Sequence, residues 1–190
     1  MTTLLLASQS PRRKELLQNL GFDFETVSIS CEEIYPADLP ASEVAAYLSE
    51  LKAGAFQPKP NEILITADTV VILNDKILGK PKDSEDALEM ILSLSGKAHQ
   101  VCTAVTIKTT ESTETFSDFA DVIFDEISPS EAEFYVENFH PTDKAGSYGI
   151  QEWLGMAKIN SIRGSFYTIM GFPTHIIYRE LKKRGVLVLN

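Results

Sequence analysis

The sequence ILITADTVVIL, residues 63 to 73, is expected to form a strong strand. It is apolar on both sides of the Asp-Thr pair at residues 68 and 69, and such a run is typical of a strand buried within a sheet. An Asn-Asp pair, residues 74 and 75, follows it directly, and both residue types favour tight turns. We therefore expect a hairpin that returns as a short partner strand at residues 76–78.

Helices alternate with strands along the rest of the chain. Further strands are expected at residues 3–7, 99–108, 115–126 and 156–162, the middle two as an antiparallel pair. Helices are expected at residues 11–20, 42–56, 84–94, 128–138 and from 173 to just before 185. This alternation, interrupted by hairpins, predicts an α/β fold with a mixed sheet. The length of 190 residues suits one fairly large domain or two small lobes, and we expect residues 1–190 to form a single domain.

The composition argues against several kinds of partner and location. A formal net charge of −10 disfavours binding to a nucleic acid polymer or an anionic membrane, because both would repel the chain. The longest apolar runs contain a few residues, far short of the ~20 that a membrane span needs. The Leu4–Leu6 run has no basic segment before it and does not resemble a secretory signal, so we expect a cytoplasmic protein. Cys31 and Cys102 fall in no metal-ligand spacing and are expected to be free thiols.

The turn between the first strand and the first helix contains Ser8, Ser10, Arg12 and Arg13. Helix N-termini bind anions readily, because their backbone N–H groups are unpaired and carry partial positive charge. Two arginines in a first helical turn are unfavourable there by about 0.3–1 kcal/mol each, unless an anion lies nearby. A phosphate chain would remove that penalty and suits the bidentate geometry of arginine. The alternative is two solvated arginines near surface carboxylates.

Asp68 and Lys80 are the second and third candidates. A carboxylate inside a buried strand is costly unless it is hydrogen-bonded, ion-paired or bound to a metal. The alternative is an aspartate satisfied by a neighbouring turn. Lys80 lies between Gly79 and Pro81, which restricts its backbone and aims its side chain, and a lysine suits phosphate as a compact charge. By itself, however, a Gly-Lys-Pro segment is usually only a loop, and the spacing is not that of a P-loop.

The segment 144–151, KAGSYGIQ, is the fourth candidate. Its two glycines allow the backbone to approach a ligand closely, and the Gln151 amide can both donate to and accept from the edge of a base. A plain connecting loop is the alternative. The three histidines, at positions 99, 140 and 175, show no metal-ligand spacing and are expected to be surface or satisfied side chains.

These segments, in this order and over nearly the whole chain, resemble the Maf family of nucleotide pyrophosphatases. The matching stretches are LASQSPRR (6–13), ADTVV (67–71), LGKPK (78–82), LSGKAHQVCTAV (94–105), DKAGSYGIQ (143–151) and GSFYTIMGFP (164–173). The resemblance implies two lobes around a long mixed sheet, an active cleft between them and, in many members, a homodimer. It also implies metal-dependent hydrolysis of a nucleoside triphosphate between its α and β phosphates, with Mg²⁺ as the expected ion and Mn²⁺ as the alternative.

Residue roles follow from the matching motifs. Asp68 would be the catalytic carboxylate that activates water. Glu32 and Glu33 resemble the family's Asp-Glu pair, so Glu33 would help Asp68 to place the metal. The other matches would bind the substrate: Arg12, Arg13 and Lys80 on the phosphates, Ser8 close to them, and Lys52 as the family's helix lysine at the cleft.

The loop sequence AGSYGIQ is similar to that of the family branch that prefers dTTP and UTP. By the same resemblance, base discrimination falls on Arg12, Thr69 and Gln151. The chain departs from the usual residues of the family at Glu152, Trp153, Phe166 and Thr168, and these departures bear on base preference rather than on the reaction. Two other functions stay open: a nucleotide-binding regulator of cell division or septum formation, and a hydrolase whose targets are modified nucleotides.

Overall fold

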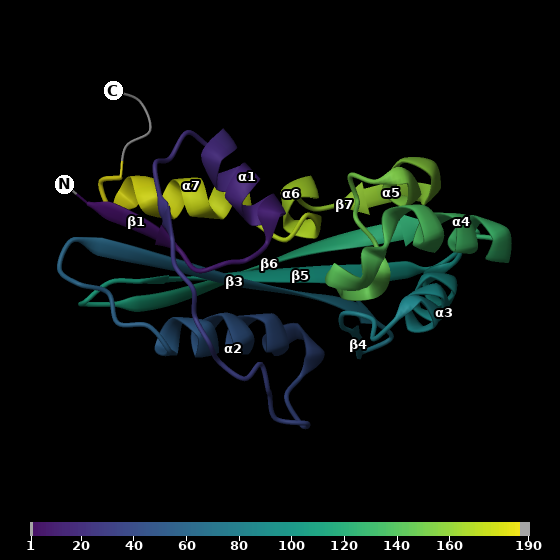
Figure 1. The fold of residues 1–190 in the computed structure, drawn as a ribbon, viewed down its shortest axis with the longest axis horizontal. Helices are drawn as coiled ribbons and strands as arrows, with labels where there is room; N and C mark the ends of the chain where they lie inside the picture. Colours follow the sequence, from purple (N-terminus) through teal and green to yellow (C-terminus); the bar gives the residue numbers. More distant parts are fainter. Residues whose placement is uncertain (1, 187–190) are drawn as a thin grey trace. The chain divides into compact units, whose positions relative to one another are not determined.

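A seven-stranded mixed sheet forms the framework of the computed structural model, which describes residues 2–186 (Figure 1). The strands are β1 (Thr3–Leu6), β2 (Glu25–Thr26), β3 (Glu62–Leu73), β4 (Lys76–Leu78), β5 (Ala98–Lys108), β6 (Thr113–Phe124) and β7 (Ile159–Arg163). Their order in the sheet is β2-β1-β3-β5-β6-β7, with β4 paired to β3. β1 runs parallel to β2 and β3, whereas β4 and β7 pair antiparallel with β3 and β6. The predicted α/β fold with a long mixed sheet is confirmed.

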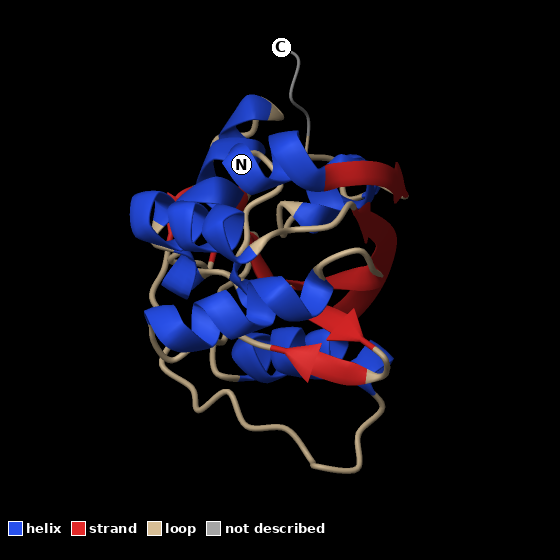
Figure 2. Ribbon diagram, turned by 90° about the vertical axis from the view of Figure 1, so that its right-hand side faces the viewer, coloured by secondary structure: helices blue, strands red, loops and turns tan. Residues whose placement is uncertain are grey.

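Helices connect most of these strands. They are α1 (Pro11–Asn19), α2 (Ala41–Gly54), α3 (Ser84–Leu94), α4 (Pro129–Phe139), α5 (Trp153–Lys158), α6 (Phe166–Ile169) and α7 (Thr174–Lys183), with 3₁₀ turns at η1 (Pro141–Asp143) and η2 (Ala145–Ser147). Residues 27–40 contain neither helix nor strand and form the long tan segment at the bottom of Figure 2. Among the helices of residues 2–186, none combines the length and the apolar character that a bilayer crossing requires.

The hairpin predicted after residue 73 is present. Val71 pairs with Leu78, and Leu73 pairs with Lys76, across a turn of two residues. Both turn residues, Asn74 and Asp75, have positive φ, at 49° and 62°. That backbone is the one a tight two-residue hairpin turn needs, and Asn and Asp adopt it more readily than other side-chain-bearing residues.

The strand predicted at residues 156–162 is wrong in its first half. Residues 153–158 form helix α5, and β7 begins only at Ile159. Gly155 explains the difference, because a Cβ at this position would lie 1.9 Å from the carbonyl oxygen of Ile150. Glycine therefore lets the helix pack directly on the backbone five residues before it, and a helix of six residues is too short to show a periodic pattern in the sequence. The two-residue strand β2 and the short helix α6 were also not predicted, since neither is long enough to show a periodic pattern.

The chain divides into two compact units, which confirms the two predicted lobes. Unit 1 comprises residues 1–68, 103–118 and 171–190, and unit 2 comprises residues 69–102 and 119–170. The boundaries fall inside β3, β5 and β6, so each of these strands contributes residues to both units. That residues 1–190 act as a single domain remains a prediction.

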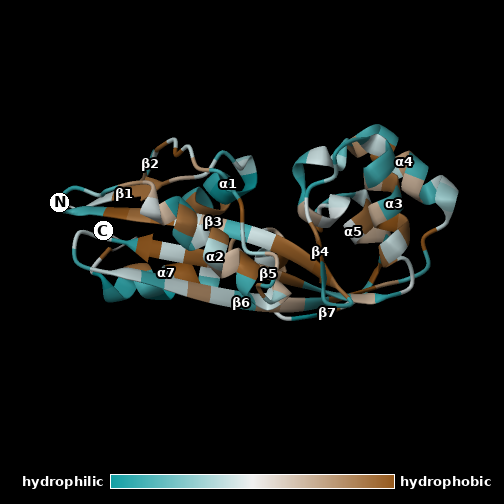
Figure 3. Ribbon diagram, turned by 90° about the horizontal axis from the view of Figure 1, so that it is seen from below, coloured by the Kyte–Doolittle hydropathy of each residue, from teal (hydrophilic) through white to brown (hydrophobic). Residues whose placement is uncertain are grey.

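In unit 1, α1 and α7 cover one face of the strands and α2 covers the other (Figure 1). Beneath α2, a small apolar cluster joins Ala53 to Leu5 and Leu64. Hydrophobic colour is prominent along β3 in Figure 3, as expected of a strand that is covered on both faces. α1 begins at Pro11 after Ser10, and the chain leaves it through Gly21 at a φ of 83°, as the sequence predicts for the ends of this helix.

A chain of buried hydroxyl groups fixes α2 against the strands of unit 1. The Thr66 Oγ1 donates to the Ser49 carbonyl oxygen at 2.7 Å and lies 3.3 Å from the Ser49 Oγ. The Thr106 Oγ1 donates to the same Ser49 Oγ at 2.8 Å and lies 2.9 Å from the Thr115 Oγ1. Because these bonds are directional, they set the position of the helix along β3, which the surrounding apolar contacts alone would not do.

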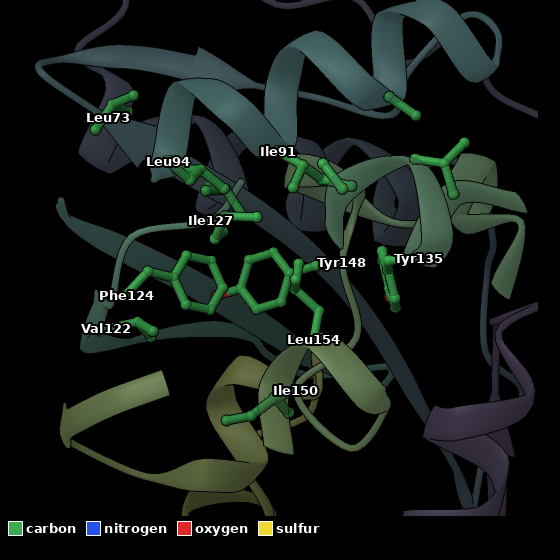
Figure 4. Packing of buried hydrophobic residues seen from close by; sticks show 14 of the residues in the cluster. Leu73, Ile91, Leu94, Val122, Phe124, Ile127, Tyr135, Tyr148, Ile150 and Leu154 are labelled. Carbon is green, nitrogen blue, oxygen red and sulfur yellow. The ribbon is translucent and has the colours of Figure 1, made fainter. Parts of the chain in front are cut away.

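In unit 2, aromatic rings form the centre of the core (Figure 4). The rings of Phe124 and Tyr148 meet edge to face with centroids 5.0 Å apart, and the ring of His99 lies 5.1 Å from Phe124. The His99 Nε2 shares a hydrogen bond of 2.7 Å with the Tyr148 hydroxyl. Among the described side chains, its Nδ1 has no hydrogen-bond partner, so His99 is only half satisfied. Burial lowers the pKa of His99 from 6.5 to about 4, since a charged ring would have to leave water.

The buried neutral state of His99 predicts a pH-dependent stability. Between pH 6.5 and about 4 the unfolded chain binds a proton at His99 that the folded chain does not, so the free energy of unfolding falls as the pH falls. We expect this decrease, from pH 7 to pH 4.5, to be about 2 kcal/mol larger in the wild type than in His99→Gln. Denaturant titrations of both proteins at pH 7 and pH 4.5 measure it. An equal decrease in both proteins would contradict the prediction.

The hydroxyl chain predicts a stability defect in Thr66→Val. Valine has nearly the same shape but removes the hydrogen bond to Ser49, and we expect the free energy of unfolding to fall by about 1–2 kcal/mol. Thr113→Val is a matched control at an exposed position of the same sheet. Denaturant unfolding of the two variants at neutral pH measures the effect, and equal stability of the two would count against a role for the hydroxyl chain.

Candidate active site

The turn before α1 retains the features of an anion site. Ser10 is the N-cap residue, but its side chain does not bond to the helix, and the first turn contains no acidic residue. The Ser10 backbone N–H instead donates to the Ser8 Oγ at 3.2 Å. Arg12 is half-buried one residue inside the helix. No carboxylate of the helix itself therefore neutralises the positive end of α1.

Arg13 lies against the backbone of unit 1 rather than in solvent. Its Nε donates to the Gly171 carbonyl oxygen at 2.8 Å, and its Nη1 donates to the Ala67 carbonyl oxygen at 2.7 Å. Burial lowers the pKa of Arg13, while the negative charge of Asp68 opposes that shift; a guanidinium keeps its proton in either case. The alternative of a solvated arginine is therefore wrong for this residue. Arg13 fixes the strand at the residue that directly precedes Asp68.

Asp68 is buried, with a side chain only 12% exposed, and its partner is a lysine. The Lys52 Nζ lies 2.5 Å from the Asp68 Oδ1 and 3.2 Å from the Glu33 Oε2. Lys52 is itself 15% exposed, whereas Glu33 is 50% exposed. The idea that a neighbouring turn satisfies Asp68 is wrong, because its ion-pair partner comes from α2. One ammonium group thus holds two carboxylates in reach of each other.

The hydroxyl chain explains how Lys52 reaches Asp68. Lys52 follows Ser49 by three residues, so both lie on one face of α2. Asp68 follows Thr66 by two residues, so both point to the same side of β3. The bonds between Ser49 and Thr66 therefore align the helix and the strand such that the charged pair meets. Sequence reasoning missed Ser49 and Thr66, although a hydroxyl within an apolar run, as at Thr66, is a signal that could have found the second of them.

The carboxylates of Asp68 and Glu33 suit a metal that is also held by substrate. No group of three or more His, Cys, Asp or Glu side chains is gathered like a metal centre in the described part of the chain. Mg²⁺ characteristically binds through one or two carboxylates together with phosphate oxygens, rather than in a cage made entirely of protein ligands. The pair Asp68 and Glu33 matches that donor set.

In unit 2 the structure brings together two of the predicted segments. The Gly146 backbone N–H donates to the Gly79 carbonyl oxygen at 3.0 Å, so the loop 144–151 is bonded to the segment that carries Lys80. Gly146 has a φ of 67°, and a Cβ there would lie 2.8 Å from the Val71 side chain, so this close approach requires glycine. Lys80 and Gln151 are exposed.

The predicted site residues are divided between the two units. Those in unit 1 are Ser8, Arg12, Arg13, Glu33, Lys52 and Asp68, and those in unit 2 are Thr69, Lys80 and Gln151. Asp68 and Thr69, consecutive residues of β3, stand at the boundary. Of the three histidines, His140 and His175 are exposed, as expected, and both cysteines are free thiols.

Comparison with known proteins supports the resemblance found in the sequence. The family model described as Maf-like protein matches residues 3–184. A protein of Bacteroides thetaiotaomicron named dTTP/UTP pyrophosphatase is 50% identical over 95% of this chain and 95% of its own length. Proteins of the same name from Porphyromonas gingivalis W83 and Flavobacterium psychrophilum are 48% and 45% identical, over 96% and 95% of this chain and 94% and 93% of their own lengths. This chain therefore belongs to the Maf family.

Proposed function

We propose that this chain hydrolyses dTTP and UTP to the nucleoside monophosphate and pyrophosphate in the cytoplasm. The observation that carries the proposal is the buried Asp68 carboxylate, paired with Lys52 and lying beside Arg13. Burial of a carboxylate costs free energy, and buried charged side chains in this arrangement are typical of active sites. The substrate preference is supported by the relatives named dTTP/UTP pyrophosphatase, which match nearly the full length of the chain.

In the proposed reaction, water attacks the α-phosphorus, and the bond from that phosphorus to the bridging oxygen breaks. Asp68 accepts the proton of the attacking water, and pyrophosphate leaves with the bridging oxygen. Lys52 orients the Asp68 carboxylate through their ion pair, so that one oxygen faces the water. General base catalysis of this kind contributes about a hundredfold to ten-thousandfold to a rate.

The triphosphate is proposed to bind through positive side chains. Arg12, Arg13 and Lys80 hold its phosphate oxygens, with Ser8 close to them. Arg13 also keeps its two bonds to backbone carbonyls, so it positions the strand and adds charge at the same time. Such fixed charges stabilise the negative charge that shifts toward the leaving group in the transition state. Base preference is assigned to Arg12, Thr69 and Gln151.

A divalent cation is part of the proposal, with Mg²⁺ favoured and Mn²⁺ as the alternative. Asp68 and Glu33 would hold it together with phosphate oxygens. When bound, it would neutralise phosphate charge and orient the attacked phosphate group. Lys52 already lies between both carboxylates, and it keeps them close in the free protein.

Two other functions and the assembly are tested with the same purified protein. A nucleotide-binding regulator would bind dTTP without releasing pyrophosphate at a useful rate. A hydrolase of modified nucleotides would show a higher kcat/KM for modified pyrimidine triphosphates than for dTTP and UTP. The homodimer implied by the resemblance is checked by the mass of the protein in solution.

Asp68→Asn tests the catalytic assignment. Asparagine keeps the size of the side chain but cannot accept the proton, so we expect kcat for dTTP to fall at least about a hundredfold. Pyrophosphate release with Mg²⁺ and with Mn²⁺ measures it, and circular dichroism checks the fold. Asp75→Asn, at the exposed turn after β3, removes the same charge and is expected to keep wild-type turnover.

Two results would count against the proposal, and each removes a different part of it. Wild-type turnover in a folded Asp68→Asn would remove the general base. Failure of the wild type to release pyrophosphate from any nucleoside triphosphate, with either cation, would remove the proposed function itself.

A further inference from the structure

A buried charged network closes the loop that ends at Gln151. The Lys144 Nζ lies 3.2 Å from the Glu152 Oε1, and the two side chains are 9% and 19% exposed. The hydroxyl of Tyr135, a fully buried residue on α4, donates to the Glu152 Oε2. The same hydroxyl accepts a hydrogen bond of 2.9 Å from the Gly149 backbone N–H. Glu152, the residue after Gln151, is therefore linked directly to Lys144 at the start of the loop and, through the Tyr135 hydroxyl, to Gly149.

Steric contacts restrict the same loop further. A Cβ at Gly149 would lie 2.8 Å from the Glu152 Cδ, so the carboxylate group packs directly over the backbone of that glycine. The Glu152 backbone N–H donates to the Gly149 carbonyl oxygen at 3.0 Å. The carbonyl of Ile150 is covered by Gly155 at the start of α5. The backbone on both sides of Gln151 is thus held, while Gln151 itself is exposed.

Burial of the charges in this network has an energetic cost that its contribution to stability does not clearly offset. Lys144 and Glu152 each lose hydration, and such pairs often contribute little to stability compared with apolar residues of the same volume. What directional charged bonds give instead is a single loop geometry. An amide can tell one base edge from another only if its position is fixed, because a mobile amide would rotate or shift to suit either edge.

We propose that Glu152, held by Tyr135 and Lys144, is a positioning residue that fixes Gln151 and thereby sets the base selectivity of the enzyme. The inference rests on the proposed function, since it assigns the base contact to Gln151. It adds a residue that touches neither the phosphates nor the reacting atoms.

The test compares Glu152→Gln with Glu131→Gln. Glu131 is a matched control in the same unit, because its carboxylate also accepts from a lysine, Lys158, and from a hydroxyl, that of Ser128. The readout is kcat and KM for dTTP, UTP, dCTP and ATP by pyrophosphate release. In Glu152→Gln we expect KM for dTTP to rise about tenfold with kcat within about threefold of wild type. The preference for dTTP over dCTP, as a ratio of kcat/KM, is expected to fall by about tenfold, and Glu131→Gln to leave it unchanged.

Two further variants separate positioning from a general loss of stability. Tyr135→Phe removes the hydroxyl that bridges Glu152 and Gly149 but keeps the ring, and it carries the test if Glu152→Gln does not fold. In a Gln151→Ala background, Glu152→Gln is expected to change the dTTP to dCTP ratio no further, because the residue it positions is gone. A purely structural role would lower the melting temperature in both backgrounds without this dependence.

Failure of this inference can be told apart from failure of the proposed function. A folded Glu152→Gln or Tyr135→Phe with the selectivity ratio of wild type would overturn the inference while leaving the pyrophosphatase intact. If the wild type binds nucleotides without hydrolysing them, the proposed function fails, and the same ratio is then taken from dissociation constants for dTTP and dCTP by calorimetry. A ratio that falls about tenfold in the variants supports the positioning role under either readout.

Discussion

The ion pair between Lys52 and Asp68 is the interaction on which the candidate site depends. Asp68 lies in an otherwise apolar strand that must be buried for the sheet to form, and a carboxylate in that setting is unstable alone. Removing one partner of a buried ion pair typically costs about 3–5 kcal/mol, so the fold must bring a cation to this point of β3. α2 supplies it. The need to satisfy one charge thus links the position of a helix to the chemistry of a strand.

The hydrogen bonds around this pair make its geometry specific. Ser49 and Thr66 align α2 with β3 through buried hydroxyl bonds, and Thr106 extends the same chain to the next strand. On the other side, Arg13 holds the Ala67 carbonyl. Hydrophobic contacts would tolerate small shifts of the helix, whereas these bonds weaken steeply with distance and angle. The carboxylate is therefore held from the helix side and from its own backbone.

Unit 2 also buries polar groups, but it does so in a core that is rich in aromatic rings. Its core is aromatic and apolar, yet it encloses one uncharged histidine and one charged network. The histidine contacts Tyr148 inside the loop 144–151, and the network around Glu152 restrains the end of that loop. These polar groups contact the loop 144–151, in which the three-residue 3₁₀ turn η2 is the one regular element. In both units, buried polar atoms occur in segments for which a role in substrate binding is proposed, although Glu180 on α7 is buried outside those segments.

Much of the fold follows from local sequence. The run ILITADTVVIL forms β3 because its apolar character and its turn residues are properties of adjacent positions, and the same holds for helices that begin at Pro11 and Ser84. The charged candidates were also found locally, since an aspartate in an apolar strand and arginines at a helix start are unusual wherever they occur. Family membership followed from the order of those segments. Local patterns failed at residues 153–158, because a helix of six residues is too short to show a period of 3.6.

Which groups meet depends on long-range packing. Nothing in the spacing of 16 residues between Lys52 and Asp68 indicates that they form a pair, because the separation depends on how α2 is aligned with β3. In the same way, Tyr135 and Glu152 come from separate elements and meet only when α4 packs beside the loop. Periodicity determines which face of an element is buried, but the partner of a buried charge is fixed by long-range packing and directional bonds, which no short stretch of sequence contains.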